Sequence, residues 1–101
     1  MKRVRFTKAA EADVERAFVR YEGERPGLGQ KFLERLDQAI NQIAKIPLAA
    51  RTVVEDVRRL MLRQFPFELW YRVRDSVIVI ARVHAKRSPA VARRRALGSE
   101  Y

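Results

Sequence analysis

The first 22 residues pass from an alternating to a helical pattern of apolar positions. Charged and apolar residues alternate from Lys2 to Phe6, as in a short half-buried strand. Thr7 follows, and its hydroxyl suits a helix N-cap. Across residues 8–22 the apolar side chains recur at helical spacing on one face; they are Ala10, Val14, Ala17, Phe18 and Tyr21. This pattern predicts a strand that leads directly into an amphipathic helix.

A second apolar stripe at helical spacing follows a short turn. The turn is rich in the residues that join two helices, namely Gly23, Pro26, Gly27 and Gly29. The stripe consists of Phe32, Leu36, Ala39, Ile40 and Ile43, and Pro47 marks its end. We therefore expect an αα-hairpin whose apolar stripes face each other, with Phe18, Tyr21 and Phe32 in the core.

Residues 48–54 form a weakly patterned connection, and after them apolar residues recur at every second position. Three strands are expected, at 57–65, 67–74 and 77–84, with a tight turn at Asp75 and Ser76. A two-residue turn predicts pairs on one face of the sheet: Val73 with Ile78, Tyr71 with Ile80, Leu69 with Arg82 and Phe67 with His84. On the other face it pairs Arg72 with Val79, Trp70 with Ala81 and Glu68 with Val83. Trp70 and Tyr71 are then more often packing residues than base-stacking platforms, and Trp70 is the more exposed candidate of the two.

The end of the chain predicts one further helix. Ser88 and Pro89 suit its N-cap and first position, and Gly98 its end, around the basic run Arg93, Arg94 and Arg95. The complete order predicts an α+β fold, β-α-α-β-β-β-(α), in which a helical hairpin packs on one side of a small, mainly antiparallel sheet. A length of 101 residues suits one core, so residues 1–101 are expected to be a single domain.

The composition excludes several classes of protein. Cysteine is absent and histidine occurs once, so neither a disulfide framework nor a zinc site made of protein ligands is expected. We expect no metal and no cofactor. No apolar run approaches the ~20 residues that cross a bilayer, and the N-terminus lacks the hydrophobic segment of a signal peptide. A cytoplasmic protein with no membrane partner is therefore expected.

The chain is strongly and unevenly basic. It carries 22 Lys and Arg against 12 Asp and Glu, a net charge of +10, which favours polyanionic partners. Residues 48–101 hold 12 of the basic residues and 5 of the acidic ones, and 11 of those 12 are arginine. Arginine favours planar, bidentate recognition of phosphate or carboxylate. The simpler alternative is a generally basic, soluble surface, to which the run of three arginines near the C-terminus belongs.

Residues 63–89, RQFPFELWYRVRDSVIVIARVHAKRSP, resemble the signature region of the RelE/ParE superfamily of toxins. In that superfamily an arginine-rich strand leads to a Phe-Pro-aromatic step, a strand with a Tyr, a hydrophobic strand and a His-x-x-Arg-x-Pro end. The resemblance also covers the opening strand and the helical hairpin. It implies the toxin of a type II toxin–antitoxin pair, bound by a cognate antitoxin that is acidic in its toxin-binding segment.

The resemblance implies one of two targets. Members either inhibit DNA gyrase without cleaving nucleic acid or act as ribosome-dependent mRNA endonucleases. The long hairpin and the lack of an evident catalytic set favour gyrase inhibition, which needs only a binding surface. The candidates for target or nucleic-acid binding are Arg59, Arg63, Arg72, Arg82, Lys86 and Arg87.

The endonuclease alternative, metal-independent, requires acid–base groups and cations around the attacked phosphate. His84 is the first candidate because imidazole titrates near neutral pH; Glu55 and Glu68 are others, and Arg82 supplies charge. We expect Arg63, Arg82, His84 and Arg87 to share one patch at the far end of the last two strands. The substrate-orienting Tyr of nuclease members has no clear equivalent, since Ala85 follows His84 and only Tyr101 lies beyond.

Two further interpretations stay open: a non-toxic basic module that binds any nucleic acid in a salt-dependent way, and a toxin-like remnant without activity. A short, acidic, adjoining open reading frame would favour the toxin.

Overall fold

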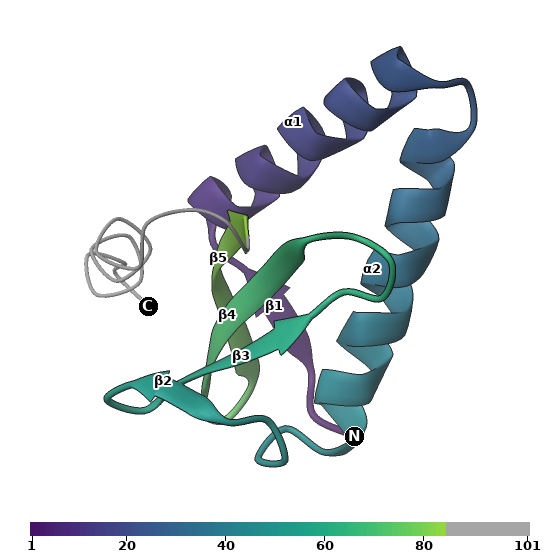
Figure 1. Cartoon of the computed structure of the whole chain (residues 1–101). Helices are drawn as coiled ribbons and strands as arrows, with labels where there is room; N and C mark the ends of the chain where they lie inside the picture. Colours follow the sequence, from purple (N-terminus) through teal and green to yellow (C-terminus); the bar gives the residue numbers. More distant parts are fainter. Residues whose placement is uncertain (85–101) are drawn as a thin grey trace.

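The computed structural model describes residues 1–84, so the helix expected at 88–98 lies outside the described residues. Within them, the helices and strands are β1 (Val4–Phe6), α1 (Lys8–Glu24), α2 (Leu28–Lys45), β2 (Thr52–Val54), β3 (Val57–Met61), β4 (Phe67–Val73) and β5 (Val77–His84). The strands of this part form one sheet in the order β1-β5-β4-β3-β2, antiparallel except for the pair of β1 and β5. Both helices lie on one side of this sheet (Figure 1). The predicted α+β fold is confirmed.

The helical hairpin is held by polar contacts at its start and at its turn. The Thr7 hydroxyl caps α1 by accepting a hydrogen bond from the Ala10 backbone N–H (3.1 Å), as predicted. At the turn, Gly27 takes the left-handed conformation (φ 88°), which glycine adopts without steric cost. The Glu22 carboxylate accepts hydrogen bonds from the backbone N–H groups of Gly27 and Gly29, each at 3.0 Å. A carboxylate of α1 thus satisfies donors at the start of α2.

The core lies between the helical hairpin and the sheet. Tyr21 and Phe32 from the helices pack against Phe65 and Phe67, with ring centroids 4.9 to 6.1 Å apart. The prediction that Tyr21 and Phe32 are core residues is confirmed. Phe18 is only half-buried, because it lies near the turn of the hairpin, beside Gly29. Its assignment to the core was wrong.

Two of the expected strand boundaries needed correction. The connection at 48–54 contains the short edge strand β2, which pairs with β3. The strand expected at 57–65 ends at Met61, because the Leu62 N–H bonds the Phe67 carbonyl (2.9 Å) and Gln64 has a positive φ of 67°. Residues 62–66 therefore form the connection between β3 and β4.

The predicted pairing of β4 and β5 is right at one end and shifted at the other. The loop has three residues rather than two, so Val73 lies opposite Val77 and Tyr71 opposite Val79. An irregularity between Trp70 and Tyr71 skips Ile80. It restores the predicted pairs from Trp70–Ala81 to Phe67–His84. The bulge compensates for the longer loop, so Arg82 and His84 keep their predicted positions in the backbone register.

Candidate target-binding surface

The face of the sheet turned away from the helices carries a charged pair from β3 and β4. Arg59 lies opposite Trp70, and its Nη1 atom is 3.3 Å from Oε2 of Glu68. The Arg59 side chain is half exposed, whereas that of Glu68 is 9% exposed. Because Glu68 is buried and already paired with a cation, it is poorly placed to act as a free general base. Arg59 remains accessible from the solvent side.

Trp70 is buried on this same face. Trp70 is 6% exposed and Tyr71 0%, so Trp70 is the more exposed of the two, as expected, yet it is itself buried. The reason is its place in the middle of β4, which has β3 on one side and β5 on the other. Its indole N–H has no hydrogen-bond partner among the described residues. Tyr71, on the helix side, is fully buried and packs in the core as expected.

Arg72 and Arg74 meet one carboxylate at the end of the sheet near the β2–β3 turn. Asp56 is 3.3 Å from Nε of Arg72 and 2.8 Å from Nη1 of Arg74. The hydrogen bond and charge of Arg74, with the charge of Arg72, hold the pKa of Asp56 below its ordinary value despite an opposing effect of burial. The Arg72 side chain is 13% exposed and that of Asp56 53%. Arg72 is thus a partly buried cation whose counter-ion lies on the outside.

Sequence reasoning missed Asp56 and Arg74. Arg74 was detectable, because it follows Arg72 by two residues and such positions lie on the same face of a strand. Asp56 was not, because its role depends on β2, the strand that the sequence pattern did not indicate.

The remaining predicted site residues lie toward the opposite end of the sheet or outside the described residues. Arg63 is exposed in the β3–β4 connection, just before Phe67, and Phe67 pairs with His84. The backbone of Arg82 pairs with Leu69; only the backbone positions of Arg82 and His84 are described. Lys86 and Arg87 lie outside the described residues. The shared patch of Arg63, Arg82, His84 and Arg87 therefore stays a prediction.

The described residues separate two of the acid–base candidates. Glu55 lies in the β2–β3 turn with a positive φ of 47°, beside the start of β3. His84 ends β5 at the opposite end of the sheet, where β3 finishes and β4 begins. Glu55 and His84 are therefore not placed to act together on one phosphate.

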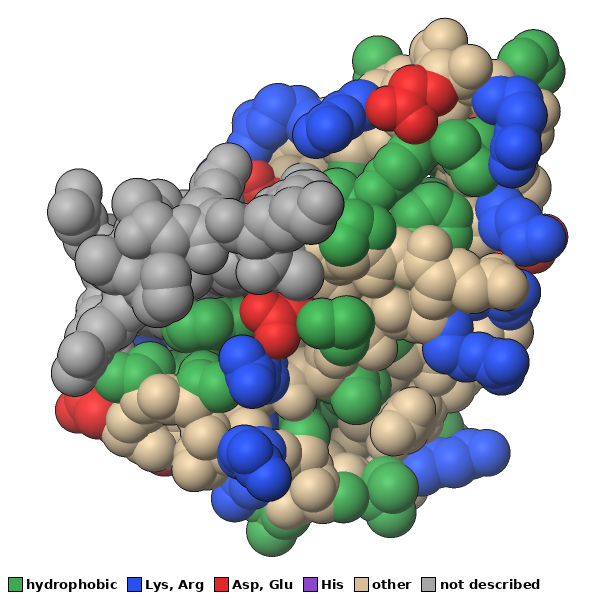
Figure 2. All heavy atoms as spheres, in the orientation of Figure 1, with side chains coloured by type: hydrophobic (Ala, Val, Ile, Leu, Met, Phe, Trp, Pro, Cys, Tyr) green, Lys and Arg blue, Asp and Glu red, His purple; other side chains and the backbone are tan. Residues whose placement is uncertain are grey.

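The described region offers no group of three or more His, Cys, Asp or Glu residues that could hold a metal ion. In residues 1–84, neither helix is long and apolar enough to span a membrane. On the face shown in Figure 2, the Lys and Arg side chains of the described residues lie at several separate places rather than in one cluster.

A family model matches most of the chain. It describes the ParE toxin of the type II toxin–antitoxin system parDE and matches residues 4–89. A search of curated proteins found no match.

Solved structures share the fold at low sequence identity. A chain of the chromosomal ParDE toxin–antitoxin system from P. aeruginosa is 19% identical, with a TM-score of 0.74 over 85% of this chain and 98% of that one. The isolated E. coli RelE toxin is 20% identical, with a TM-score of 0.64 over 92% and 94%. A chain of the RelBE2 toxin–antitoxin complex from Mycobacterium tuberculosis is 19% identical, with a TM-score of 0.57 over 84% and 93%. These similarities concern the fold alone.

Proposed function

The chain belongs to the ParE toxin family of type II toxin–antitoxin systems, and we propose that it arrests growth by inhibiting DNA gyrase. A cognate antitoxin, acidic in its toxin-binding segment, holds it inactive. The observation that carries this proposal is the family match over residues 4–89, because the matched family is the toxin of the parDE system. Two of the similar structures are named as toxin–antitoxin systems or complexes, which supports the antitoxin as a partner.

The geometry of the sheet supports a binding surface rather than a catalytic centre. Glu68 is buried against Arg59, and Glu55 and His84 lie at opposite ends of the sheet. Half-exposed Arg59 and Arg74, and exposed Arg63, remain accessible to a partner. Inhibition of an enzyme by binding requires an accessible surface, to which these cations can contribute, but no acid–base pair.

The direct experiment adds the purified protein to two assays in parallel. One measures supercoiling of a relaxed plasmid by DNA gyrase, and the other maps new mRNA ends in a translating ribosome system. We expect supercoiling to be lost while the mRNA stays intact. Intact supercoiling with ribosome-dependent cleavage would contradict the proposal and establish the endonuclease branch. Binding to any DNA or RNA without either effect would indicate the non-toxic basic module.

The endonuclease alternative is favoured by one observation. Arg63 and the backbone of His84 lie toward the same end of the sheet, as a phosphate-binding and proton-transferring pair requires. If cleavage is detected, His84→Gln and Arg82→Ala should each lower its rate by about 10²-fold or more, the usual effect of removing an acid–base group or an anion-stabilising donor. Primer extension measures that rate, with Arg16→Ala on α1 as the control; unchanged cleavage would remove both residues from the mechanism.

A further inference from the structure

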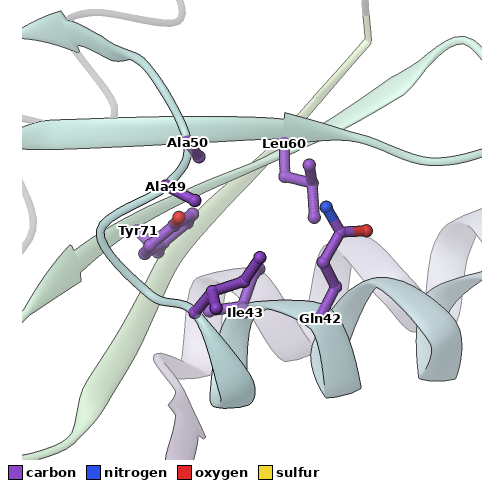
Figure 3. Close-up of a pocket in the computed structure, with 7 residues that line it drawn as sticks. Gln42, Ile43, Ala49, Ala50, Leu60 and Tyr71 are labelled. Atoms are coloured by element: carbon purple, nitrogen blue, oxygen red, sulfur yellow. The ribbon is translucent and has the colours of Figure 1, made fainter.

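A groove runs along the second half of α2 and deepens toward the sheet. Its deeper part has a volume of about 160 Å³ and lies between α2, the loop at 46–50 and strands β3 and β4. The residues around it are Gln42, Ile43, Ile46, Ala49, Ala50, Leu60 and Tyr71 (Figure 3). A shallower part of about 440 Å³ continues along the helix and is lined by Gln38, Asn41, Gln42, Lys45 and Ile46. The two parts share Gln42 and Ile46, and we call them together the α2 groove.

Two side chains from the sheet hold the loop that forms one wall of the α2 groove. The buried Tyr71 donates its hydroxyl hydrogen bond to the Pro47 carbonyl at 2.9 Å. Arg58 donates to the carbonyls of Leu48 at 3.1 Å and Ala50 at 2.6 Å. Burial raises the pKa of Tyr71, so its hydroxyl stays protonated as a donor at neutral pH. The wall is therefore fixed before any partner arrives, which lowers the entropic cost of binding.

The deeper part suits an apolar side chain. Its walls are mainly aliphatic. Ile46 lines it and Leu48 belongs to the loop at 46–50, and these two side chains are 54% and 63% exposed. An engineered apolar cavity of about 150 Å³ accommodates benzene, so one branched or aromatic side chain fits a hollow of this volume. Large exposed apolar side chains beside a hollow are typical of an interaction surface.

The shallower part suits a peptide backbone and a carboxylate. Gln38, Asn41 and Gln42 present carboxamides, which both donate and accept hydrogen bonds, as a peptide backbone does. Lys45 has no carboxylate partner among the described residues. Among the same residues, Arg58 donates hydrogen bonds only to the backbone carbonyls of the loop at 46–50. No Asp or Glu lines either part. The local charge is therefore positive and complementary to an acidic segment.

We propose that the α2 groove is a docking site for an extended acidic segment of the antitoxin. One apolar side chain of that segment fills the hollow, its backbone pairs with the carboxamides, and a carboxylate meets Lys45. The identity of the partner rests on the proposed function, whereas the location and the chemistry of the site rest on the residues of the groove.

The test measures the affinity of the full-length protein for the product of the adjacent open reading frame. Ala49→Trp fills the hollow, Lys45→Glu reverses the charge, and Gln42→Glu places a carboxylate between the two parts with little change of shape. Lys31→Glu is the matched control, because it makes the same charge change on α2 outside the groove. We expect each groove variant to weaken binding by about 10-fold or more, and the control by less than about 3-fold.

Circular dichroism and thermal unfolding show which variants fold, and Gln42→Glu keeps the test decisive if Ala49→Trp does not. Unchanged affinity of folded groove variants would overturn the docking site. Failure of the wild-type protein to bind the antitoxin would overturn both the docking site and its proposed partner. Groove variants that lose binding to duplex DNA instead of binding to the antitoxin would do the same. Gyrase inhibition, measured without antitoxin on the same variants, is a separate result: its absence would contradict the proposed target while leaving the groove supported.

Discussion

At the scale of single residues, the ion pairs of Asp56 with Arg72 and Arg74 are the clearest electrostatic contacts of the described sheet. Asp56 joins the β2–β3 turn to two arginines that extend from the end of β4, at 3.3 and 2.8 Å. Asp56 and Arg74 are both about half exposed, so solvent screens much of this attraction, and an exposed ion pair contributes only about 0–1 kcal/mol. The contact therefore orders a turn more than it stabilises the fold.

Asp56→Asn should lower the free energy of unfolding at pH 7 by about 0.5 kcal/mol. The folded-state pKa of Asp56 is lowered, so its contribution is present above the unfolded pKa of about 3.9 and disappears as pH falls through the folded value. Urea unfolding of both proteins at pH 7 and at pH 2.5 should thus show a difference only at pH 7. Asp75→Asn, in the exposed neighbouring turn, makes the same charge change as a control. An equal effect of both substitutions would refute the role of Asp56.

Sequence reasoning found cations at this scale but not their partners. Arg59 and Arg72 follow from the alternation of β3 and β4, because alternation decides the face. Their partners Glu68 and Asp56 depend on how neighbouring strands are aligned, and Asp56 on a strand that was not expected at all. A single sequence carries no direct signal for such lateral contacts.

At the scale of elements, the turn between α1 and α2 depends on one glycine. A Cβ atom at Gly29 would lie 2.8 Å from two ring carbons of Phe18 and 2.9 Å from Oε1 of Glu22. Gly29 also donates its N–H to that same carboxylate oxygen at 3.0 Å. Its small size therefore allows the two helices and the Glu22 cap to approach closely.

Gly29→Ala should destabilise the protein by about 1–3 kcal/mol, because the added methyl group forces Phe18 and Glu22 aside. Gly23→Ala is the matched control: it also lies in a helix, but no atom lies within 4 Å of the position that its methyl group would take. That control should stabilise by up to about 1 kcal/mol through helix propensity. Guanidinium unfolding of the two variants measures the contrast, and a stable Gly29→Ala protein would show that the turn tolerates a wider separation.

The long elements were predictable and the short ones were not. Both helices carry several turns of apolar spacing, and Thr7 and Pro47 mark a beginning and an end that the structure confirms to within about two residues. Strand β2 has three residues at the sheet edge, too few to establish alternation. The bulge at Ile80 could not be predicted from the sequence. The extra residue in the loop and the skipped residue in β5 compensate for each other, so the pairing at the far end of the two strands is unchanged.

At the scale of the whole molecule, the two proposed interactions lie on different sides of the sheet. The α2 groove lies on the helix side, whereas Arg59 and Arg72 extend from the opposite face. Sequence similarity identified the superfamily and the fold, because those depend on a pattern that spans the chain. The target remains a proposal, since a surface is recognised by shape and charge spread over several elements rather than by one motif.

The net charge of +10 makes a prediction about how fast an acidic antitoxin binds. Long-range attraction raises the rate of encounter, and salt screens it over about 10 Å at 0.1 M. The association rate should therefore fall by about 10-fold or more between roughly 0.05 and 0.5 M salt, while the dissociation rate, set by contacts within the complex, should change by less than about 3-fold.

Stopped-flow mixing measures the association rate and surface plasmon resonance the dissociation rate. Sucrose at matched viscosity is the control for slower diffusion. An association rate that is independent of salt would mean that the antitoxin is not steered by the charge of this protein. Its affinity would then depend on the apolar contacts of the α2 groove, and Ala49→Trp would weaken binding much more than Lys45→Glu.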